Sequence, residues 1–319
     1  MTQNTSKLVT FGEAMVRLSP PEFRRLEQAH TLDFQAGGAE LNAAIAAHRL
    51  GLPARFVTRL TQNPLGHMIE NKAREHGVDT SCIAWTDADR VGVYFVEFGA
   101  APRPNTVLYD RRDSAMAHVR LGEIDWECAL RGADYFHTSG ITPALSPSAA
   151  AETIEAIRTA RRLGAQVSVD LNYRARLWTQ AEARRVMSQI ASETDILITT
   201  EEDTERVFGI AAPSYEEVAR LLAREFALDA VVITLRETPS VWRNAWSAMA
   251  YDARADVVIH APTFDIEVVD RVGSGDAFAG GFLAGYAKDG IELGVRWGVG
   301  VSALKQTYPW DFSCATPED

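Results

Sequence analysis

Short apolar segments alternate with longer amphipathic segments along most of this 319-residue chain, and this alternation limits the possible folds more than any other feature. The apolar segments, many of them β-branched, are residues 8–11, 55–60, 133–137, 166–171, 195–198 and 230–234. The amphipathic segments, expected to be helices, are residues 40–50, 65–76, 147–163, 180–192 and 214–226. Strands separated by helices of this length form a parallel sheet that helices cover on both faces. We therefore predict an α/β fold.

Two stretches interrupt this alternation. Residues 13–35 contain strand-like pieces around Pro20 and Pro21, and residues 91–112 contain two β-type runs with no helix after them. We expect these stretches to form a small sheet that projects from the main body as a lid. Residues 242–260 are typical of a further hairpin at the sheet edge. Because the chain has no internal repeat and no low-complexity linker, we predict a single domain spanning residues 1–319 with this lid.

The balance of charges argues against two classes of partner. The chain has 32 Lys and Arg against 43 Asp and Glu, a formal net charge of −11, and no long basic run. Such a protein is a poor candidate for binding nucleic acid or an anionic membrane. Three widely spaced cysteines, with no CxxC pair, favour a reduced, cytoplasmic protein. We find no signal peptide and no apolar run of membrane-helix length.

The most informative motif lies near the C-terminus, where a strand-like segment leads into DRVGSGDAFAGG and an apolar helix follows. Gly273, Ser274 and Gly275 allow a sharp turn whose amides face outward at a helix start, which is a typical anion site. Asp276 would lie beside a bound phosphate and could accept the proton of an attacking hydroxyl. The alternative is a glycine turn in which Asp276 only caps the helix.

A second motif, GGAELN, opens the first long helix. The pair Gly37 and Gly38 would allow a sugar to rest against the backbone, and Asn42 could hydrogen-bond a hydroxyl. Taken alone, a glycine pair is more often an ordinary loop before a helix.

Together the two motifs make the chain resemble the ribokinase (phosphofructokinase-B type) carbohydrate kinases, and the resemblance covers essentially the whole chain. It implies a ribokinase-like α/β fold, with a central mostly parallel sheet, helices on both faces and a small β-sheet lid over the sugar. It also implies ATP and Mg²⁺ as cofactors. We see no dense carboxylate cage, so we predict no metal-ligating residues and expect Mg²⁺ to be carried by phosphates. The catalytic residues it implies are Asp276, Gly273, Ser274, Gly275 and Arg174.

Further segments resemble the 2-keto-3-deoxygluconate kinases of this family. They are Phe11-Gly12-Glu13, the run from Ser139 to Ser146, Asp170-Leu171-Asn172-Tyr173-Arg174, Gly92-Val93-Tyr94 and Tyr109-Asp110-Arg111. A sugar acid needs a cation for its carboxylate, and Arg111 offers a planar fork of donors. The resemblance implies the substrate-binding residues Gly37, Gly38, Asn42, Tyr94, Tyr109, Arg111, Arg174, Asp270, Asp276 and Asp311. A single arginine in a charged loop is otherwise more often on the surface, and the tyrosines could be lid core.

The nucleotide side departs from the family pattern. The family has a glycine-containing turn after the strand at 230–234, whereas Arg236 and Pro239 stand here where glycines are expected. Either Arg236 contacts the phosphates in place of lost backbone bonds, or the loop is displaced and ATP binds weakly. The nucleotide-binding residues implied are Asn172, Thr200, Thr234, Glu237, Gly273, Ser274 and Gly275.

Three functions remain open at this point. The first is ATP-dependent phosphorylation of 2-keto-3-deoxygluconate to its 6-phosphate, without distinction from its galactonate epimer. The second is a kinase for fructose or another neutral sugar, which would not require a buried cation. The third is a non-catalytic sugar-acid-binding homologue, motivated by Arg236 and Pro239. Assembly of copies through the lid is a further expectation.

Overall fold

The computed structural model describes residues 7–240 and 242–319, and its central feature is a nine-stranded sheet. The strands are β1 (Leu8–Phe11), β4 (Ala54–Val57), β9 (Tyr135–Ser139), β10 (Gln166–Asp170), β11 (Ile196–Thr199), β12 (Ala230–Ser240), β13 (Arg243–Asp252), β14 (Val257–His260) and β15 (Phe264–Glu267). They follow the order β14-β13-β12-β11-β10-β9-β1-β4, and β15 also pairs with β13. Neighbours from β4 to β12 are parallel, and the pairs that involve β13 are antiparallel. The predicted mostly parallel sheet is confirmed.

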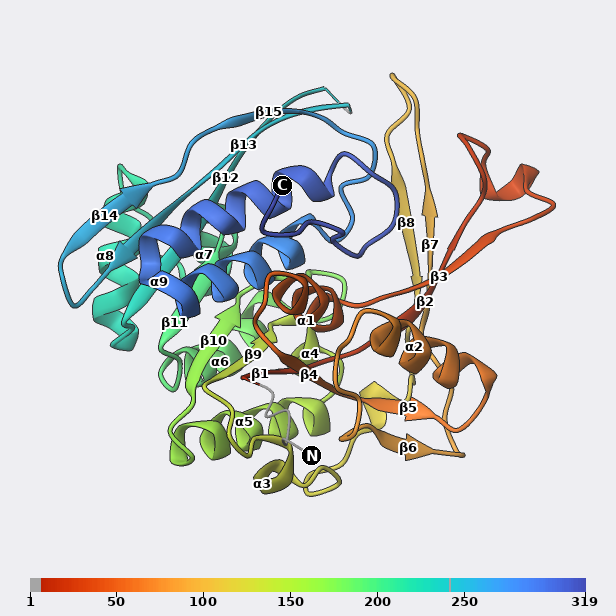
Figure 1. Cartoon of the computed structure of the whole chain (residues 1–319), viewed down its shortest axis with the longest axis horizontal. Coiled ribbons are helices and arrows are strands. Elements are labelled where there is room, and N and C mark those ends of the chain that lie inside the picture. Colours follow the sequence, from red (N-terminus) through yellow and green to blue (C-terminus); the bar gives the residue numbers. More distant parts are fainter. Residues whose placement is uncertain (1–6, 241) are drawn as a thin grey trace.

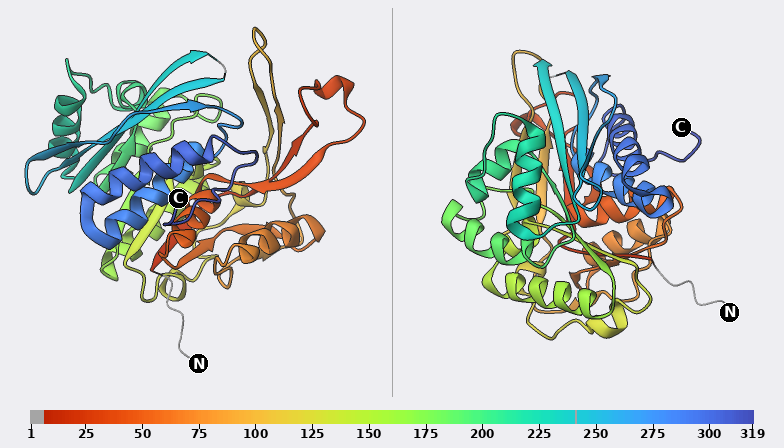
Figure 2. Two further views of the ribbon diagram at one scale, coloured as in Figure 1. Left: turned by 45° about the horizontal axis from the view of Figure 1, so that its top comes forward. Right: turned by 90° about the vertical axis from the view of Figure 1, so that its left-hand side faces the viewer.

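Helices cover both faces of this sheet (Figure 1 and the right-hand view of Figure 2). The longer ones are α1 (Ala39–Arg49), α2 (Pro64–Glu75), α5 (Pro147–Arg162), α6 (Gln180–Ala191), α7 (Glu201–Phe208), α8 (Tyr215–Phe226) and α9 (Ser274–Lys305). Short helices are α3 (Trp126–Ala129) and α4 (Ile141–Ala144), with 3-10 turns at Leu26–Gln28 and Met116–His118. Successive strand residues point to opposite faces. Leu8 therefore packs with α1 and α9, whereas Val9 packs in the second core with α5 to α8.

A separate small sheet projects beside the carboxyl end of the main sheet (Figures 1 and 2). We use "small sheet" for β2 (Met15–Ser19), β3 (Asp33–Gly37), β7 (Val93–Glu97) and β8 (Thr106–Asp110), which pair in the order β3-β2-β7-β8. All four strands come from the two stretches that interrupt the helix–strand alternation. These stretches lack the amphipathic helix that would carry the chain back to the main sheet, so they pair with each other instead.

Two strand predictions are wrong in their bounds. The single strand expected over residues 55–60 is divided into β4 and β5 (Arg59–Thr61), because the chain leaves the main sheet at Thr58 and β5 pairs with β6 (Ala84–Thr86). The strand expected to end at residue 234 continues to Ser240, because it pairs with β13 as far as Glu237 and again at Ser240, with an irregularity between the two.

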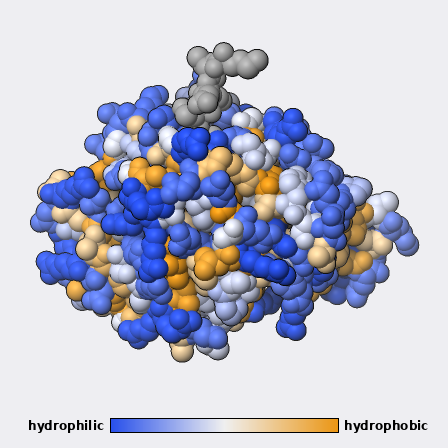
Figure 3. Space-filling model, turned by 90° about the horizontal axis from the view of Figure 1, so that it is seen from below, coloured by the Kyte–Doolittle hydropathy of each residue, from blue (hydrophilic) through white to orange (hydrophobic). Residues whose placement is uncertain are grey.

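The face opposite the small sheet's free end is mostly polar, with apolar residues in small separate patches (Figure 3). Within the part of the chain that the structure describes, no helix has both the length and the apolar character needed to cross a membrane.

Candidate active site

A cavity of about 390 Å³ lies between the small sheet and the carboxyl edge of the main sheet. Residues at the ends of successive parallel strands line it: Asp170 ends β10, Thr199 ends β11 and Thr234 lies in β12. In open α/β sheets, ligands bind at this carboxyl edge. The cavity is therefore the candidate site.

The turn before α9 forms one wall of the cavity. Gly273 has φ +82°, and a Cβ there would lie 2.2 Å from the carbonyl oxygen of Asp311, so both conformation and space require glycine. The amide of Ser274 donates a 3.2 Å hydrogen bond to the carbonyl oxygen of Arg271. Within the described chain, the amides of Gly275 and Asp276 donate to no backbone carbonyl, and open space lies beside Gly275. These amides and the helix start form a site suited to an anion.

Asp276 lies in the first turn of α9 and faces the cavity. Its Oδ2 accepts a 2.7 Å hydrogen bond from Nδ2 of Asn42, whose own Oδ1 accepts from the amide of Gly38. Burial raises the pKa of Asp276, and the bond from Asn42 opposes that rise. Asn42 therefore orients the carboxylate and favours its charged form. A carboxylate beside free helix amides can take a proton from a hydroxyl that approaches a bound anion.

Glu40 is a buried acid that sequence reasoning missed. It lines the cavity floor, and its Oε1 accepts hydrogen bonds from the amide and hydroxyl of Ser139 and the hydroxyl of Thr142. Burial raises the pKa of Glu40 to about 7. Its position two residues before Asn42, on the same buried helix start, was the available signal.

Two further acids, Asp170 at the end of β10 and Asp203 in α7, also line the cavity. Burial raises the pKa of Asp170, followed by the charges of Asp276 and Asp203, and Arg174 opposes this rise. Burial also raises the pKa of Asp203. Closely placed carboxylates that lack full compensation suit a cation, although no group of three or more metal-ligating side chains occurs among residues 7–240 and 242–319.

The small sheet supplies aromatic and cationic side chains to the cavity. Tyr94 and Tyr109 stack with ring centroids 5.8 Å apart, and the guanidinium of Arg111 lies 5.6 Å from the centre of the Tyr109 ring. Arg111 forms an ion pair with Glu13, which also lines the cavity. Tyr94 is 2% exposed, and its hydroxyl donates to Oδ2 of Asp311 at 2.6 Å.

A buried arginine, Arg17 in β2, forms ion pairs with two of the acids that were predicted to bind substrate, Asp270 and Asp311. Its Nη2 lies 2.7 Å from Oδ2 of Asp270, and its Nη1 lies 2.5 Å from Oδ1 of Asp311. Burial lowers the pKa of Arg17, but the two carboxylates outweigh it and the net shift is upward. Asp270 is fully buried and does not line the cavity, whereas Asp311 does. Gly37 also stays outside: a Cβ there would meet the Tyr94 hydroxyl at 2.1 Å, so it makes room for the pair of Tyr94 and Asp311.

On the nucleotide side, the segment that carries Arg236 forms a strand where a turn was expected. Arg236 lies opposite Trp246 in the β12–β13 hairpin, not in a turn, and both side chains line the cavity. Burial and the nearby charge of Arg236 lower the pKa of Arg271, which also lines the cavity. Two arginines near each other suit a polyanion. Glu237, the next residue of the strand, does not line the cavity.

The cavity thus brings together most of the predicted residues. Those that line it are Gly38, Asn42, Tyr94, Tyr109, Arg111, Asn172, Arg174, Thr200, Thr234, Gly273, Ser274, Gly275, Asp276 and Asp311. Gly37, Glu237 and Asp270 do not. Sequence reasoning missed the lining residues Glu40, Asp203 and Trp246, and it assigned no role to Glu13, Asp170 and Arg271.

Comparisons with known proteins agree with this geometry. The profile of the pfkB family carbohydrate kinases matches residues 5–310. A 2-dehydro-3-deoxygalactonokinase of Haloferax volcanii is 38% identical over 99% of this chain and 95% of its own. A 5-dehydro-2-deoxygluconokinase of Bacillus licheniformis is 29% identical over 91% and 87%. The crystal structure of a 2-dehydro-3-deoxygluconokinase from Thermotoga maritima is 41% identical, with a TM-score of 0.94 over 98% of this chain and 95% of that one.

Proposed function

The chain belongs to the pfkB family of carbohydrate kinases, and we propose that it transfers the γ-phosphate of ATP to 2-keto-3-deoxygluconate, giving the 6-phosphate. The observation that carries this proposal is the position of Asp276. Its carboxylate lies beside the amides at the start of α9, in one cavity with Arg111 and Arg174. That arrangement offers a base, an anion site and two cations.

Asp276 acts in this proposal as the general base, which removes the proton of the attacking sugar hydroxyl. The amides of Gly275 and Asp276 and the dipole of α9 stabilise the charge on the transferring phosphoryl group. Arg174 adds a positive charge on the side of Asp170. Asn42 holds the base in place through its 2.7 Å hydrogen bond.

Recognition of a sugar acid rests on Arg111. It is the cation at the small-sheet side of the cavity, and Tyr109 lies against it. A guanidinium binds a carboxylate through charge-assisted hydrogen bonds that a neutral sugar cannot make. The names of the relatives from Haloferax volcanii and Thermotoga maritima, both kinases of 2-dehydro-3-deoxy sugar acids, support the same class of substrate.

On the nucleotide side, we propose that Thr200, Thr234, Arg236 and Arg271 surround the phosphates of ATP. Mg²⁺, bound to those phosphates, would neutralise their charge, and the carboxylates of Asp170 and Asp203 are the protein groups that fit it. The raised pKa of both acids supports this, because a nearby cation would relieve the cost of their burial and mutual repulsion.

A coupled assay of ADP release tests the function. Purified protein is given ATP and Mg²⁺ with 2-keto-3-deoxygluconate, its galactonate epimer, fructose and a buffer blank. We expect kcat/KM to be far higher with one of the two sugar acids than with fructose. We expect no ADP release after exhaustive chelation of Mg²⁺. Preference for fructose would favour a neutral-sugar kinase. Binding of a sugar acid without ADP release would favour a non-catalytic homologue.

We also propose that the chain is one domain in which residues 13–35 and 91–112 form the lid, and that two copies associate through it. The small sheet has two open edges, and Phe34 and Leu108 on it are exposed by 46% and 53%, as is Leu32 just before β3 by 38%. Apolar side chains on an unpaired sheet favour self-association. Sedimentation of the wild type and of Leu108→Glu would test this, and a monomeric wild type would overturn it. The three cysteines are free thiols, which supports a cytoplasmic location.

A further inference from the structure

The carboxylate of Glu13 holds the guanidinium of Arg111 at the wall of the cavity. Glu13 lies in the loop between β1 and β2 and is 3% exposed. Its Oε2 accepts a 2.7 Å hydrogen bond from Nε of Arg111 and also contacts Nη2. Both residues line the cavity. The pair therefore faces the site and is shielded from bulk solvent, with side-chain exposures of 10% for Arg111 and 2% for Glu13.

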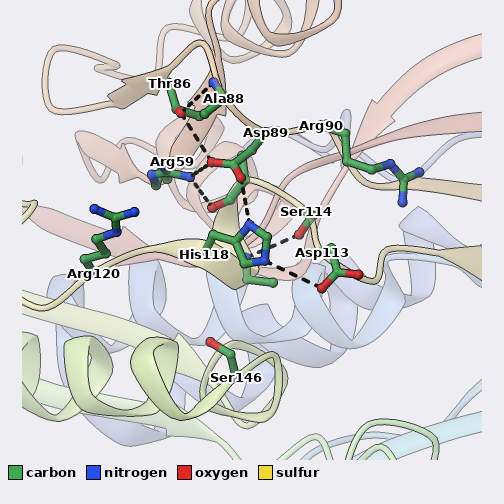
Figure 4. A network of polar contacts seen from close by, with 12 residues as sticks. Arg59, Thr86, Ala88, Asp89, Arg90, Asp113, Ser114, His118, Arg120 and Ser146 are labelled. Carbon is green, nitrogen blue, oxygen red and sulfur yellow. Dashed lines mark hydrogen bonds and ion pairs between the residues drawn. The ribbon is translucent and has the colours of Figure 1, made fainter.

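The second oxygen of Glu13 is fixed as well, because the hydroxyl of Ser114 donates to Oε1. The segment around Ser114 is anchored to the body by the polar network of Figure 4. There Nη1 of Arg59 donates to the carbonyl of Ala115 at 2.8 Å, and Arg59 also pairs with Asp89, which in turn bonds to His118 at 2.7 Å. Ser114 is thus a rigid partner, and so is the carboxylate that it binds.

Glycines give the Glu13 loop its close fit. A Cβ on Gly38 would lie 2.3 Å from the carbonyl oxygen of Glu13, and one on Gly92 would lie 3.1 Å from Oε1. The backbone of Glu13 is therefore pressed against the start of α1, and its side chain passes beside the start of β7. A larger residue at Gly38 or Gly92 would therefore displace Glu13 from its place beside Arg111.

This contact decides which donors of Arg111 reach a ligand. A guanidinium is planar, and Nε and Nη2 form one of its two-donor edges. Glu13 occupies that edge, which leaves both donors of Nη1 and the second donor of Nη2 for the cavity. Within residues 7–240 and 242–319, Arg111 pairs with no other carboxylate. An arginine without such a partner would sample several rotamers, and it would lose this side-chain conformational entropy when it binds a ligand.

We propose that Glu13 is a positioning residue, which holds Arg111 in the orientation that binds the sugar substrate. This rests on the proposed function in one respect: Arg111 must contact the sugar. Glu13 itself touches neither the transferred phosphate nor Asp276 in this arrangement, so its loss should weaken sugar binding and leave the chemical step largely intact.

A double-mutant cycle tests the proposal. Glu13→Ala, Arg111→Ala and the double variant are compared by KM and kcat for whichever sugar the wild type phosphorylates best. We expect Glu13→Ala to raise the sugar KM about tenfold or more, with KM for ATP and kcat changed by less than about threefold. In the Arg111→Ala background, Glu13→Ala should change the sugar KM by less than about twofold. If the two effects instead multiply, Glu13 acts independently of Arg111 and the proposal is overturned.

Two further variants protect the test from trivial failure. Glu13→Asp keeps the charge but is too short to reach both Arg111 and Ser114, so it replaces Glu13→Ala in the cycle if the alanine variant does not fold. Glu13→Gln keeps an acceptor for Arg111 and should restore most of the sugar KM. A glutamine variant as impaired as the alanine variant would contradict a positioning role.

The control is Glu97→Ala, which removes another ion pair of the small sheet, with Arg103 at 2.7 Å, outside the cavity. An equal rise of the sugar KM in Glu97→Ala would mean that Glu13 only stabilises the sheet, and it would overturn the proposal. The cycle is measured with the sugar that the wild type prefers. If that sugar is neutral, the sugar-acid assignment is refuted, but the cycle still tests whether Glu13 positions Arg111.

Discussion

The side-chain amide of Asn42 lies 2.7 Å from Oδ2 of Asp276 and joins the start of α1 to the first turn of α9. The two residues are 234 positions apart in sequence, and each belongs to one of the two glycine motifs. The motifs are therefore two halves of one site, in which the first orients the acid that the second supplies.

Replacing Asp276 by Asn should remove the base and leave the fold intact, because Asn is isosteric and can still accept at Oδ1. We expect kcat to fall about 10²–10⁴-fold, the usual contribution of general-base assistance, with sugar affinity nearly unchanged. Steady-state kinetics and calorimetric titration with the sugar measure the two quantities. Turnover close to that of the wild type would make Asp276 only a helix cap.

Replacing Asn42 by Ala should move the pH dependence of the reaction. Burial raises the pKa of Asp276 and the Asn42 bond opposes it, so without that bond the pKa rises further. A base works only when deprotonated, and the acidic limb of kcat/KM should therefore shift to higher pH. The exposed Asn71 on α2 provides the control Asn71→Ala, whose profile should overlay that of the wild type.

Arg111→Ala should weaken binding of sugar acids far more than binding of ATP. A lost hydrogen bond to a charged group costs about 1.5–3 kcal/mol, so we expect KM for the acid to rise about 10- to 150-fold. Arg112→Ala, the neighbouring exposed arginine, is the matched control and should leave KM unchanged. An equal loss for charged and neutral sugars would assign Arg111 to the folding of the small sheet.

Glu40 predicts a pH dependence of stability. Its pKa rises from 4.5 to about 7 on folding, so the folded chain binds more protons than the unfolded chain between these values. The contribution of Glu40 to the free energy of unfolding is therefore fully present below about pH 4.5. It is lost as pH rises through about 7, and the total loss is about 3 kcal/mol. Urea unfolding at pH 5 and pH 8 should show a smaller difference for Glu40→Gln than for the wild type. The exposed control Glu225→Gln should keep the wild-type difference.

Arg236→Ala should reduce affinity for ATP. Its side chain faces the cavity near Arg271, and both positive charges would lie beside phosphates. Calorimetry with ATP should show weaker binding, while Glu237→Ala, one residue further along the strand and outside the cavity, should bind normally. Tighter binding by Arg236→Gly than by the wild type would mean that the arginine obstructs the nucleotide.

Local patterns predict most of the sheet, because the spacing of apolar residues within each segment indicates whether it forms a strand or a helix. The alternation of Leu8 and Val9 between two cores is an example of information held within one strand. The extension of β12 to Ser240 was missed because it depends on a partner, β13, whose pairing also holds Arg236 in extended conformation. The pairing of two strands cannot be predicted from the residues of either strand alone.

The site was predictable where a motif carried its own geometry, as at Gly273 and Asp276. Asp270 shows the limit. It stands six residues before Asp276 in a motif of clear function, yet its carboxylate is taken by Arg17, which lies 253 residues away. Glu40 was missed for a related reason: its hydrogen-bond partners are Ser139, which ends β9, and Thr142 in α4, and nothing near Glu40 in sequence reveals them.

The buried contact between Arg17 and Asp311 spans 294 residues and so has a consequence for how the chain is made. On the ribosome, the strand that carries Arg17 emerges long before its acidic partners, because Asp270 and Asp311 follow 253 and 294 residues later. Until then this arginine has no buried counter-charge, and enclosing it alone would be costly. We therefore expect the base of the small sheet to stay open during translation and to close only after Asp270 and Asp311 have left the exit tunnel.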